Sequence, residues 1–182
     1  SVVVAPIRQP DGRITHYVEL KQDVSDRKRA AQEIHRLAHY DSLTSLPNRF
    51  MLIERLASLQ ARHQRSGDDV HVLLLLDLDR FKRINDSFGH LAGDAVLKEV
   101  AATLAEQLEP GMVLGRYGGE EFAILLPNCA DLAQAKRVAE RLRVAVEARL
   151  VKSPTSDELL EVTVSIGLTL SLRGESVEEL LN

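Results

Sequence analysis

Residues 112–126 read Met-Val-Leu-Gly-Arg-Tyr-Gly-Gly-Glu-Glu-Phe-Ala-Ile-Leu-Leu, and this stretch decides the fold. Two apolar runs flank a Gly-Gly pair, which predicts a β-hairpin because glycines adopt the positive φ angles of a tight two-residue turn. Glu120 and Glu121 open the second strand, where neighbouring residues point to opposite faces. Two like charges add nothing to a structural hairpin. The pattern therefore favours a site for a divalent cation or a phosphate-bearing substrate over a solvated hairpin tip. Arg116, just before the turn, is expected to pair with a carboxylate.

A second acidic element lies upstream, at the end of an apolar run. Residues 70–76 are too short to cross a membrane and predict a buried strand, which ends in Asp77-Leu78-Asp79. Asp79 suits the N-cap of a following helix, whereas Asp77 still lies within the apolar strand. If Asp77 and Glu120 are adjacent in one sheet, they form a carboxylate cluster able to bind Mg²⁺.

Four motifs follow one another along the chain: DSLTSLPNR at 41–49, DLDRFKRINDSFGHLAGD at 77–94, GGEEF at 118–122 and VSIG at 164–167. In this order they resemble the opening motif, the long central motif, the signature and a late strand of the GGDEF diguanylate cyclases. GGEEF is the Glu variant of that signature and would be a weak signal alone. The resemblance implies an α/β (α+β) fold with a palm-like, ferredoxin-related sheet, as in nucleotide cyclases.

The resemblance implies an enzyme that condenses two GTP molecules into cyclic di-GMP and two pyrophosphates. One domain holds one GTP, so a homodimer is needed for catalysis. Asp77, Glu120 and Glu121 would ligate Mg²⁺ (or Mn²⁺), with the backbone carbonyl of Leu78 as a further ligand. Which glutamate acts as base and which as ligand stays open. Lys82 would stabilise the charge that develops during phosphoryl transfer.

The rest of the implied site binds the nucleotide. Asn85 and Asp94 would read guanine, because an amide can meet the acceptors of the ring edge and a carboxylate accepts its N–H groups. Asp94 would serve equally well as a helix N-cap. His90 would either line the nucleotide site or fix its loop. The other implied substrate contacts are Phe81 beside the phosphates, and Gly118 and Gly119, which leave a phosphate room near the backbone.

The chain departs from the family pattern at two places. Ser45 stands where the family has Gly; if that turn needs a positive φ, Ser costs on the order of 1 kcal/mol. The inhibitory product site of the family needs R-x-x-D before the hairpin, but residues 109–112 are Glu-Pro-Gly-Met. We therefore expect weak binding of cyclic di-GMP at that position. The family's C-terminal helix and strand are expected to be cut off after 177–181.

Composition excludes several classes of protein. The chain has 182 residues with a net charge of −4, which argues against a basic nucleic-acid-binding face. No apolar run is long enough to span a bilayer, and no signal peptide is expected, so we predict no membrane contact within this stretch. The single cysteine, Cys129, cannot form an internal disulfide, which fits a reducing cytoplasm.

Three segments are expected. Residues 1–25 resemble the C-terminal strands of a PAS sensor domain, and 26–40 form a signalling linker helix that is either one heptad of a coiled coil or an ordinary amphipathic linker. Residues 41–182 form the GGDEF domain, truncated at its C-terminus. After a helix at about 48–65, its order is β-α-α-β-β-α-β, and we expect a mixed central sheet flanked by helices.

Two other functions stay open at this point. The domain could be a catalytically weak, GTP-binding regulator of a neighbouring phosphodiesterase domain, or a dimerisation module with an unused site. The full set of Asp77, Glu120 and Glu121 favours the cyclase, because a domain that only binds GTP has less need of every carboxylate.

Overall fold

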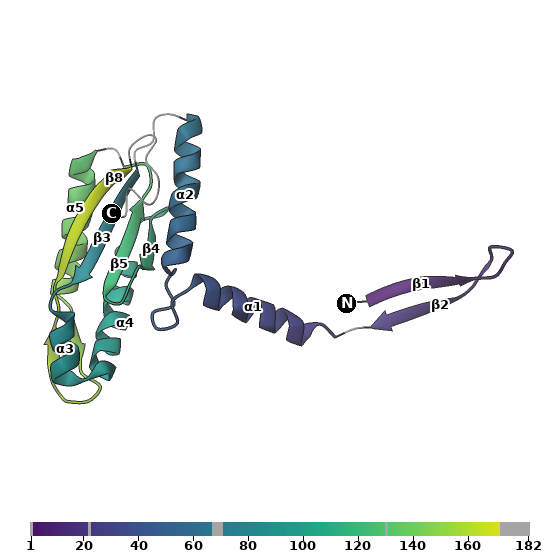
Figure 1. Ribbon diagram of the computed structural model, residues 1–182, viewed down its shortest axis with the longest axis horizontal. Helices are drawn as coiled ribbons and strands as arrows, with labels where there is room; N and C mark the ends of the chain where they lie inside the picture. Colours follow the sequence, from purple (N-terminus) through teal and green to yellow (C-terminus); the bar gives the residue numbers. More distant parts are fainter. Residues whose placement is uncertain (1, 22, 67–70, 130, 172–182) are drawn as a thin grey trace. The chain divides into compact units, whose positions relative to one another are not determined.

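The computed structural model describes residues 2–21, 23–66, 71–129 and 131–171. They belong to two compact units, residues 1–38 and 39–182, which are treated separately (Figure 1).

The first unit contains a hairpin and a helix. Strand β1 (Val2–Arg8) pairs antiparallel with β2 (Ile14–Lys21), and α1 (Ser25–His39) follows. Apolar side chains of the hairpin are exposed, among them Tyr17 at 67 %. The apolar positions of α1, such as Leu37, are exposed as well. Both predicted strands and the linker helix are present, whereas their assignment to a PAS domain remains a prediction.

The second unit contains a central sheet, its covering helices and a small second hairpin. Its elements in chain order are α2 (Arg49–Ser66), β3 (His71–Leu78), α3 (Phe81–Phe88), α4 (His90–Glu106), β4 (Val113–Arg116), β5 (Glu121–Leu126), α5 (Leu132–Glu147), β6 (Leu150–Lys152), β7 (Leu159–Glu161) and β8 (Val164–Ser171). The predicted order is confirmed, with β6 and β7 added as a separate antiparallel pair. The last helix, expected from 177, lies outside the described residues.

The central sheet has the strand order β4-β5-β3-β8. Each pairing among its described strands is antiparallel, so the expected parallel pair is not found there. The reason lies in the hairpin. The crossover through α3 and α4 makes β4 run in the direction of β3, but β5 inserts between them and opposes both. This is the split βαβ arrangement of ferredoxin-like sheets.

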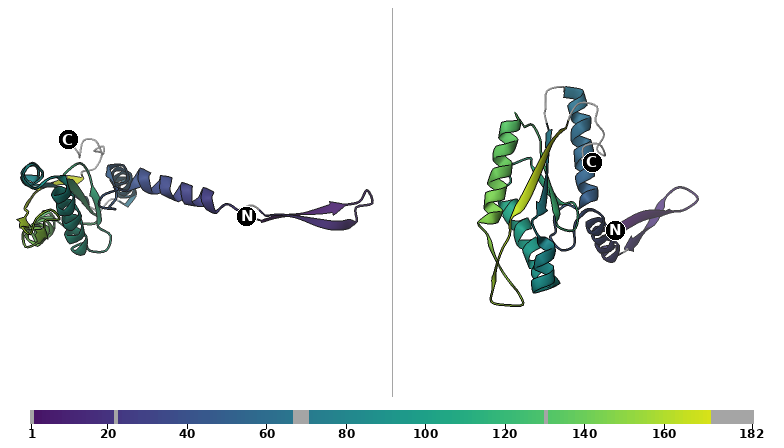
Figure 2. Two further views of the ribbon diagram at one scale, coloured as in Figure 1. Left: turned by 90° about the horizontal axis from the view of Figure 1, so that it is seen from below. Right: turned by 60° about the vertical axis from the view of Figure 1, so that its left-hand side comes forward.

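The sheet buries both of its faces, and the alternation along β3 sorts its side chains between two cores. Leu74 and Leu76 belong to a large core that also contains side chains of α4 and α5. Leu73 lies opposite Leu125 of β5, and both pack with Leu52 of α2 in a smaller core. Figure 2 shows α2 and α5 on opposite sides of the sheet. The site therefore sits at the end of strands that are held rigidly on both faces.

Candidate active site

The acidic ends of β3 and β5 meet in the sheet. Asp77 is the cross-strand partner of Glu121, and the N–H of Leu78 donates to the carbonyl of Glu120 at 3.3 Å. The predicted adjacency of the two acidic segments is confirmed, but the residue opposite Asp77 is Glu121 rather than Glu120. Glu120 is the last residue of the loop before β5, so the ladder does not fix the direction of its side chain. Asp77 and Glu121 line one pocket of about 390 Å³.

The oxygen donors at these strand ends suit a hard divalent cation. Cross-strand partners have Cβ atoms about 5 Å apart, which lets the carboxylates of Asp77 and Glu121 approach each other. Within the described residues, no three His, Cys, Asp or Glu side chains gather around one point. Mg²⁺ does not require such a cage, because it is commonly held by one or two carboxylates together with water and substrate phosphates. The donor set therefore fits Mg²⁺ or Mn²⁺.

The connection between β4 and β5 differs from the predicted two-residue turn. It comprises residues 117–120, and neither Gly118 nor Gly119 has a positive φ. That part of the turn prediction is wrong because the longer loop needs no left-handed residue. A Cβ on Gly118 would meet Oε2 of Glu121, the end of a flexible, exposed side chain, which would have to move aside. The carboxylate of Glu121 thus lies directly over the Gly118 backbone.

Arg116 holds the loop between β4 and β5 in place through hydrogen bonds from its guanidinium group. Its guanidinium donates to the carbonyls of Gly118 (3.2 Å) and Gly119 (2.6 Å) and to both carboxylate oxygens of Asp41 (3.1 and 3.2 Å). Burial alone would raise the pKa of Asp41, but hydrogen bonds from Thr44 and Arg116 outweigh it, so this pKa lies below its ordinary value. An ion pair therefore joins the opening motif to the signature.

The residues expected to read guanine lie on α3 and α4. Asn85 of α3 packs directly against Gly93 of α4, where a Cβ would overlap the Asn85 amide oxygen. Asp94 is half-buried within α4 and is not its N-cap, which is Gly89. The capping alternative for Asp94 is thus wrong. The ring of Phe81 lies in the core, 7 % exposed, which leaves its backbone as the group available to a phosphate.

Lys82 and His90 are exposed near these residues. Lys82 lies in the first turn of α3, and His90 is the first residue of α4. Both lie on the helix pair that carries Asn85, and their roles at the site stay predictions.

The chain matches known proteins both in sequence and in structure. Residues 38–182 match the family model described as diguanylate cyclase, GGDEF domain. The chain belongs to the GGDEF family. The expected fold class is confirmed by solved GGDEF structures: the coiled coil and GGDEF domain of DgcB from Caulobacter crescentus, in complex with c-di-GMP, has a TM-score of 0.79 at 31 % identity over 87 % of this chain and 82 % of that one.

Curated relatives of this GGDEF chain include a named diguanylate cyclase and a named response regulator. Diguanylate cyclase DgcP of Pseudomonas aeruginosa is 47 % identical over 129 residues, which are 71 % of this chain and 19 % of the relative. Response regulator PleD of Caulobacter vibrioides is 44 % identical over 146 residues, 80 % of this chain and 32 % of the relative. The chain thus spans about a fifth of the length of DgcP and about a third of the length of PleD.

Asp79 has a different role in this GGDEF domain from the predicted helix cap. The N-cap of α3 is Arg80, in a left-handed conformation with φ 58°, and no side chain caps the helix. Asp79 instead accepts hydrogen bonds from Ser165 (2.7 Å) and Thr163 (2.6 Å), which lower its pKa. The prediction was wrong because these hydroxyls lie far along the chain, next to β3 only through sheet pairing.

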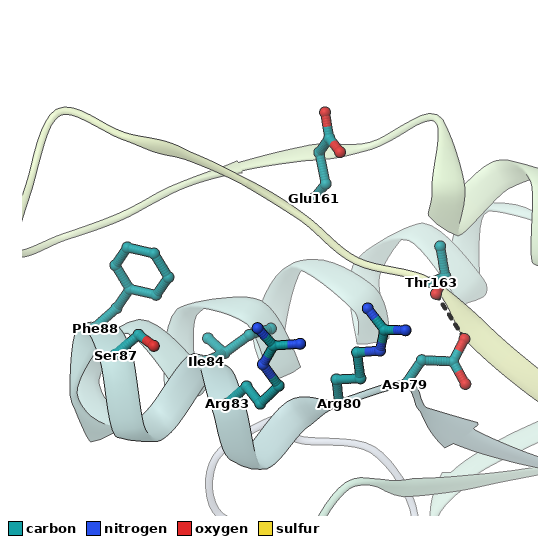
Figure 3. A pocket seen from close by; sticks show the side chains of 8 residues that line it. All are labelled: Asp79, Arg80, Arg83, Ile84, Ser87, Phe88, Glu161 and Thr163. Carbon is teal, nitrogen blue, oxygen red and sulfur yellow. Dashed lines mark hydrogen bonds between the residues drawn. The ribbon is translucent and has the colours of Figure 1, made fainter.

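A groove of about 800 Å³ beside α3 was not foreseen from the sequence. It lies between α3 and the segment that carries Glu161 and Thr163, and Figure 3 shows the guanidinium groups of Arg80 and Arg83 in it. Asp79 and Glu161 balance the two arginines in charge. The α3 residues that line the groove do not include Asn85, which lies on another side of the helix. The groove therefore lies beside the predicted nucleotide site.

Asp41 was the other contributor that sequence reasoning missed. Arg116 was expected to meet some carboxylate, and its pairing with Asp41 confirms this. The signal in the sequence was weak: Asp41 opens the first motif, and Arg116 lies two positions before the GGEEF signature.

Proposed function

We propose that this GGDEF domain is a diguanylate cyclase, which converts two GTP molecules into cyclic di-GMP and two pyrophosphates. The observation that carries the proposal is the β3–β5 pairing, which sets Asp77 opposite Glu121 next to the α3–α4 pair. Relatives between 38 and 47 % identical are named diguanylate cyclases, which supports the same activity. A purely regulatory GTP-binding role has no observation in its favour.

The acidic strand ends would hold Mg²⁺ or Mn²⁺. Asp77, Glu120 and Glu121 would supply carboxylates and Leu78 its backbone carbonyl. When bound, Mg²⁺ would neutralise negative charge on the triphosphate and lower the pKa of a hydroxyl group next to the ion. Lys82, at the start of α3, would add a positive charge where the triphosphate lies. The carboxylate of Glu121 lies over Gly118 at the hairpin, and either Glu120 or Glu121 would take the proton of the attacking hydroxyl.

The guanine would be bound between α3 and α4. Asn85 would donate to an acceptor of the base and Asp94 would accept from its N–H groups. His90 is exposed at the start of α4, where it can line the same pocket. Gly118 and Gly119 would let the phosphates approach the hairpin, and open space around Gly119 is consistent with that role.

The reaction requires two such domains. The 3′-oxygen of one GTP attacks the α-phosphorus of the other, the bond to pyrophosphate breaks, and the hydroxyl proton leaves to a nearby base. Each domain presents one GTP, so a homodimer forms the complete site. We also propose that residues 1–25 end a PAS sensor module and that α1 links it to the cyclase. No helix in the described part of the chain has the length and apolar character needed to cross a membrane.

The direct test is incubation of the chain with GTP and Mg²⁺, followed by chromatography of nucleotides and a pyrophosphate assay. We expect cyclic di-GMP, a rate per domain that rises with protein concentration, and complete loss of product with EDTA. Glu121→Gln should lower turnover at least ~100-fold, while Glu158→Gln, an exposed glutamate of the small hairpin, should leave it unchanged. GTP binding without product would favour the regulatory role, and no binding would refute both.

A further inference from the structure

We propose that Arg116 is a positioning residue: it fixes the peptides of Gly118 and Gly119 so that two backbone N–H groups face the phosphates of the substrate. Asp41 orients Arg116 for this task. The inference rests on the proposed function and assigns a role to two residues that bind no metal and no base.

The contacts of Arg116 involve all three nitrogens of its guanidinium group. Nη2 donates to the carbonyl of Gly119 at 2.6 Å, and Nε is shared between the carbonyls of Gly118 and Gly119, both at 3.2 Å. Nη1 donates to both oxygens of Asp41. A guanidinium is planar and presents donors on several sides at fixed angles. It can therefore hold two carbonyls and one carboxylate in a single geometry.

Because the Gly118 and Gly119 carbonyls point towards Arg116, the direction of the N–H groups that follow them is also fixed. In a trans peptide the C=O and the following N–H point in opposite directions. With the carbonyls of Gly118 and Gly119 directed at Arg116, the N–H groups of Gly119 and Glu120 are directed away from it. Neither N–H has a hydrogen-bond partner among the described residues. Two successive outward N–H donors form a concavity that suits an anion such as a phosphoryl oxygen.

The orientation of Arg116 is itself held from both ends. Asp41 accepts hydrogen bonds from the backbone N–H (2.8 Å) and the hydroxyl (2.7 Å) of Thr44, so its carboxylate cannot turn freely. The backbone N–H of Arg116 donates to the carbonyl of Pro47 at 2.9 Å. The side chains of Arg116 and Asp41 are only 15 % and 21 % exposed, so water screens their attraction little. The whole unit forms one rigid support behind the hairpin.

A purely structural salt bridge would predict a different pattern of effects. Such a bridge would join residues 41–48 to the hairpin, and its loss would lower thermal stability but leave the turnover of the folded protein intact. If Arg116 positions the hairpin peptides, its loss should instead lower kcat strongly and change the thermal stability little. A lysine in place of Arg116 could restore the ion pair with Asp41, but its single ammonium group cannot also hold both carbonyls in the fork geometry.

The experiment compares kcat, KM for GTP and melting temperature of the full chain and its variants Arg116→Lys, Arg116→Ala and Asp41→Asn. The matched control is Arg141→Lys, which alters another ion-paired arginine, bonded to Glu109 at 2.7 Å. We expect Arg116→Lys to lose on the order of 100-fold in kcat, as when one transition-state donor is removed, with KM within a few-fold. Asp41→Asn should lose less, and added guanidinium should restore part of the activity of Arg116→Ala.

A second measurement covers variants that fail to fold. In the unaltered chain, NMR should show the amide proton of Gly119 moving downfield when α,β-methylene GTP and Mg²⁺ are added. An unmoved Gly119 amide, or full kcat in a folded Arg116→Lys variant, would overturn the inference while leaving the cyclase assignment in place. Absence of product from the unaltered chain would overturn both.

Discussion

Replacement of Gly93 by Ala should separate stability from nucleotide binding. Gly93 lies in the interior of α4, where Ala is favoured over Gly by about 1 kcal/mol. The new Cβ would overlap the amide oxygen of Asn85 and lie 3.1 Å from Cζ of Phe81. The Asn85 amide ends a flexible side chain and can rotate away, but the buried Phe81 ring has little room. Such overpacking costs roughly 1–3 kcal/mol, so the net stability loss should be about 0–2 kcal/mol.

The effect on GTP should be larger than this net change. If Asn85 reads guanine, its displacement removes one hydrogen bond and leaves a base atom unpaired, which costs about 1–2 kcal/mol. This corresponds to a rise in KM of about 5- to 30-fold. The value of kcat should hold, because the carboxylates of β3 and β5 are not touched.

The assay is steady-state turnover of Gly93→Ala, Asn85→Ala and the double variant, with urea unfolding of each. In the double variant the new Cβ at position 93 meets no amide, so the second substitution should add almost no further loss of GTP affinity. Ala102→Gly, at an exposed position of α4, calibrates the helix-propensity gain. A normal KM in a folded Gly93→Ala protein would refute the placement of guanine against Asn85.

Three further changes test the fold. Ser45 has φ 59°, so Ser45→Gly should stabilise by up to about 1 kcal/mol in urea unfolding, whereas Ser42→Gly, outside the left-handed region, should not. The pKa of Asp41 is lowered, so its contribution to the free energy of unfolding is complete above the ordinary carboxyl pKa and is lost as pH falls below about 4; unfolding of Asp41→Asn should show a flatter acid limb. Leu74, fully buried in the large core, should lose about 3–5 kcal/mol on change to Ala, with an unchanged two-state transition.

Much of the fold could be predicted because its signals are local. The apolar run before Asp77 became β3, and residues 112–126 became the β4–β5 pair. Gly89 ends α3, as expected from its position after the helical pattern. The condition attached to Ser45 is met, because Ser45 has a positive φ in its turn. Each of these features depends on the conformational preferences of a few residues that are neighbours in the sequence.

The missing parts of the site depend on contacts that no local pattern contains. Asp79 was predicted to be a helix N-cap because Asp is common at that position before a helix. In the folded sheet, however, the hydroxyls of Thr163 and Ser165 donate hydrogen bonds to its carboxylate. The antiparallel sheet is a similar case, since insertion of β5 beside β3 is decided by the tertiary fold. Arg116 and Asp41 are 75 positions apart and meet only because β4 packs beside residues 47–48.

The partner of Asp77 shows most clearly why a site needs the register as well as the motif. The signature places Glu120 and Glu121 side by side in the sequence, and both satisfy any rule based on composition. Because strand side chains alternate, a shift of one residue would exchange the two glutamates between the faces of the sheet. The apolar side chains of β3 and β5, which alternate between the two cores, keep Glu121 opposite Asp77. Residues outside the acidic cluster, the buried apolar side chains of the two strands, therefore decide which carboxylate faces Asp77.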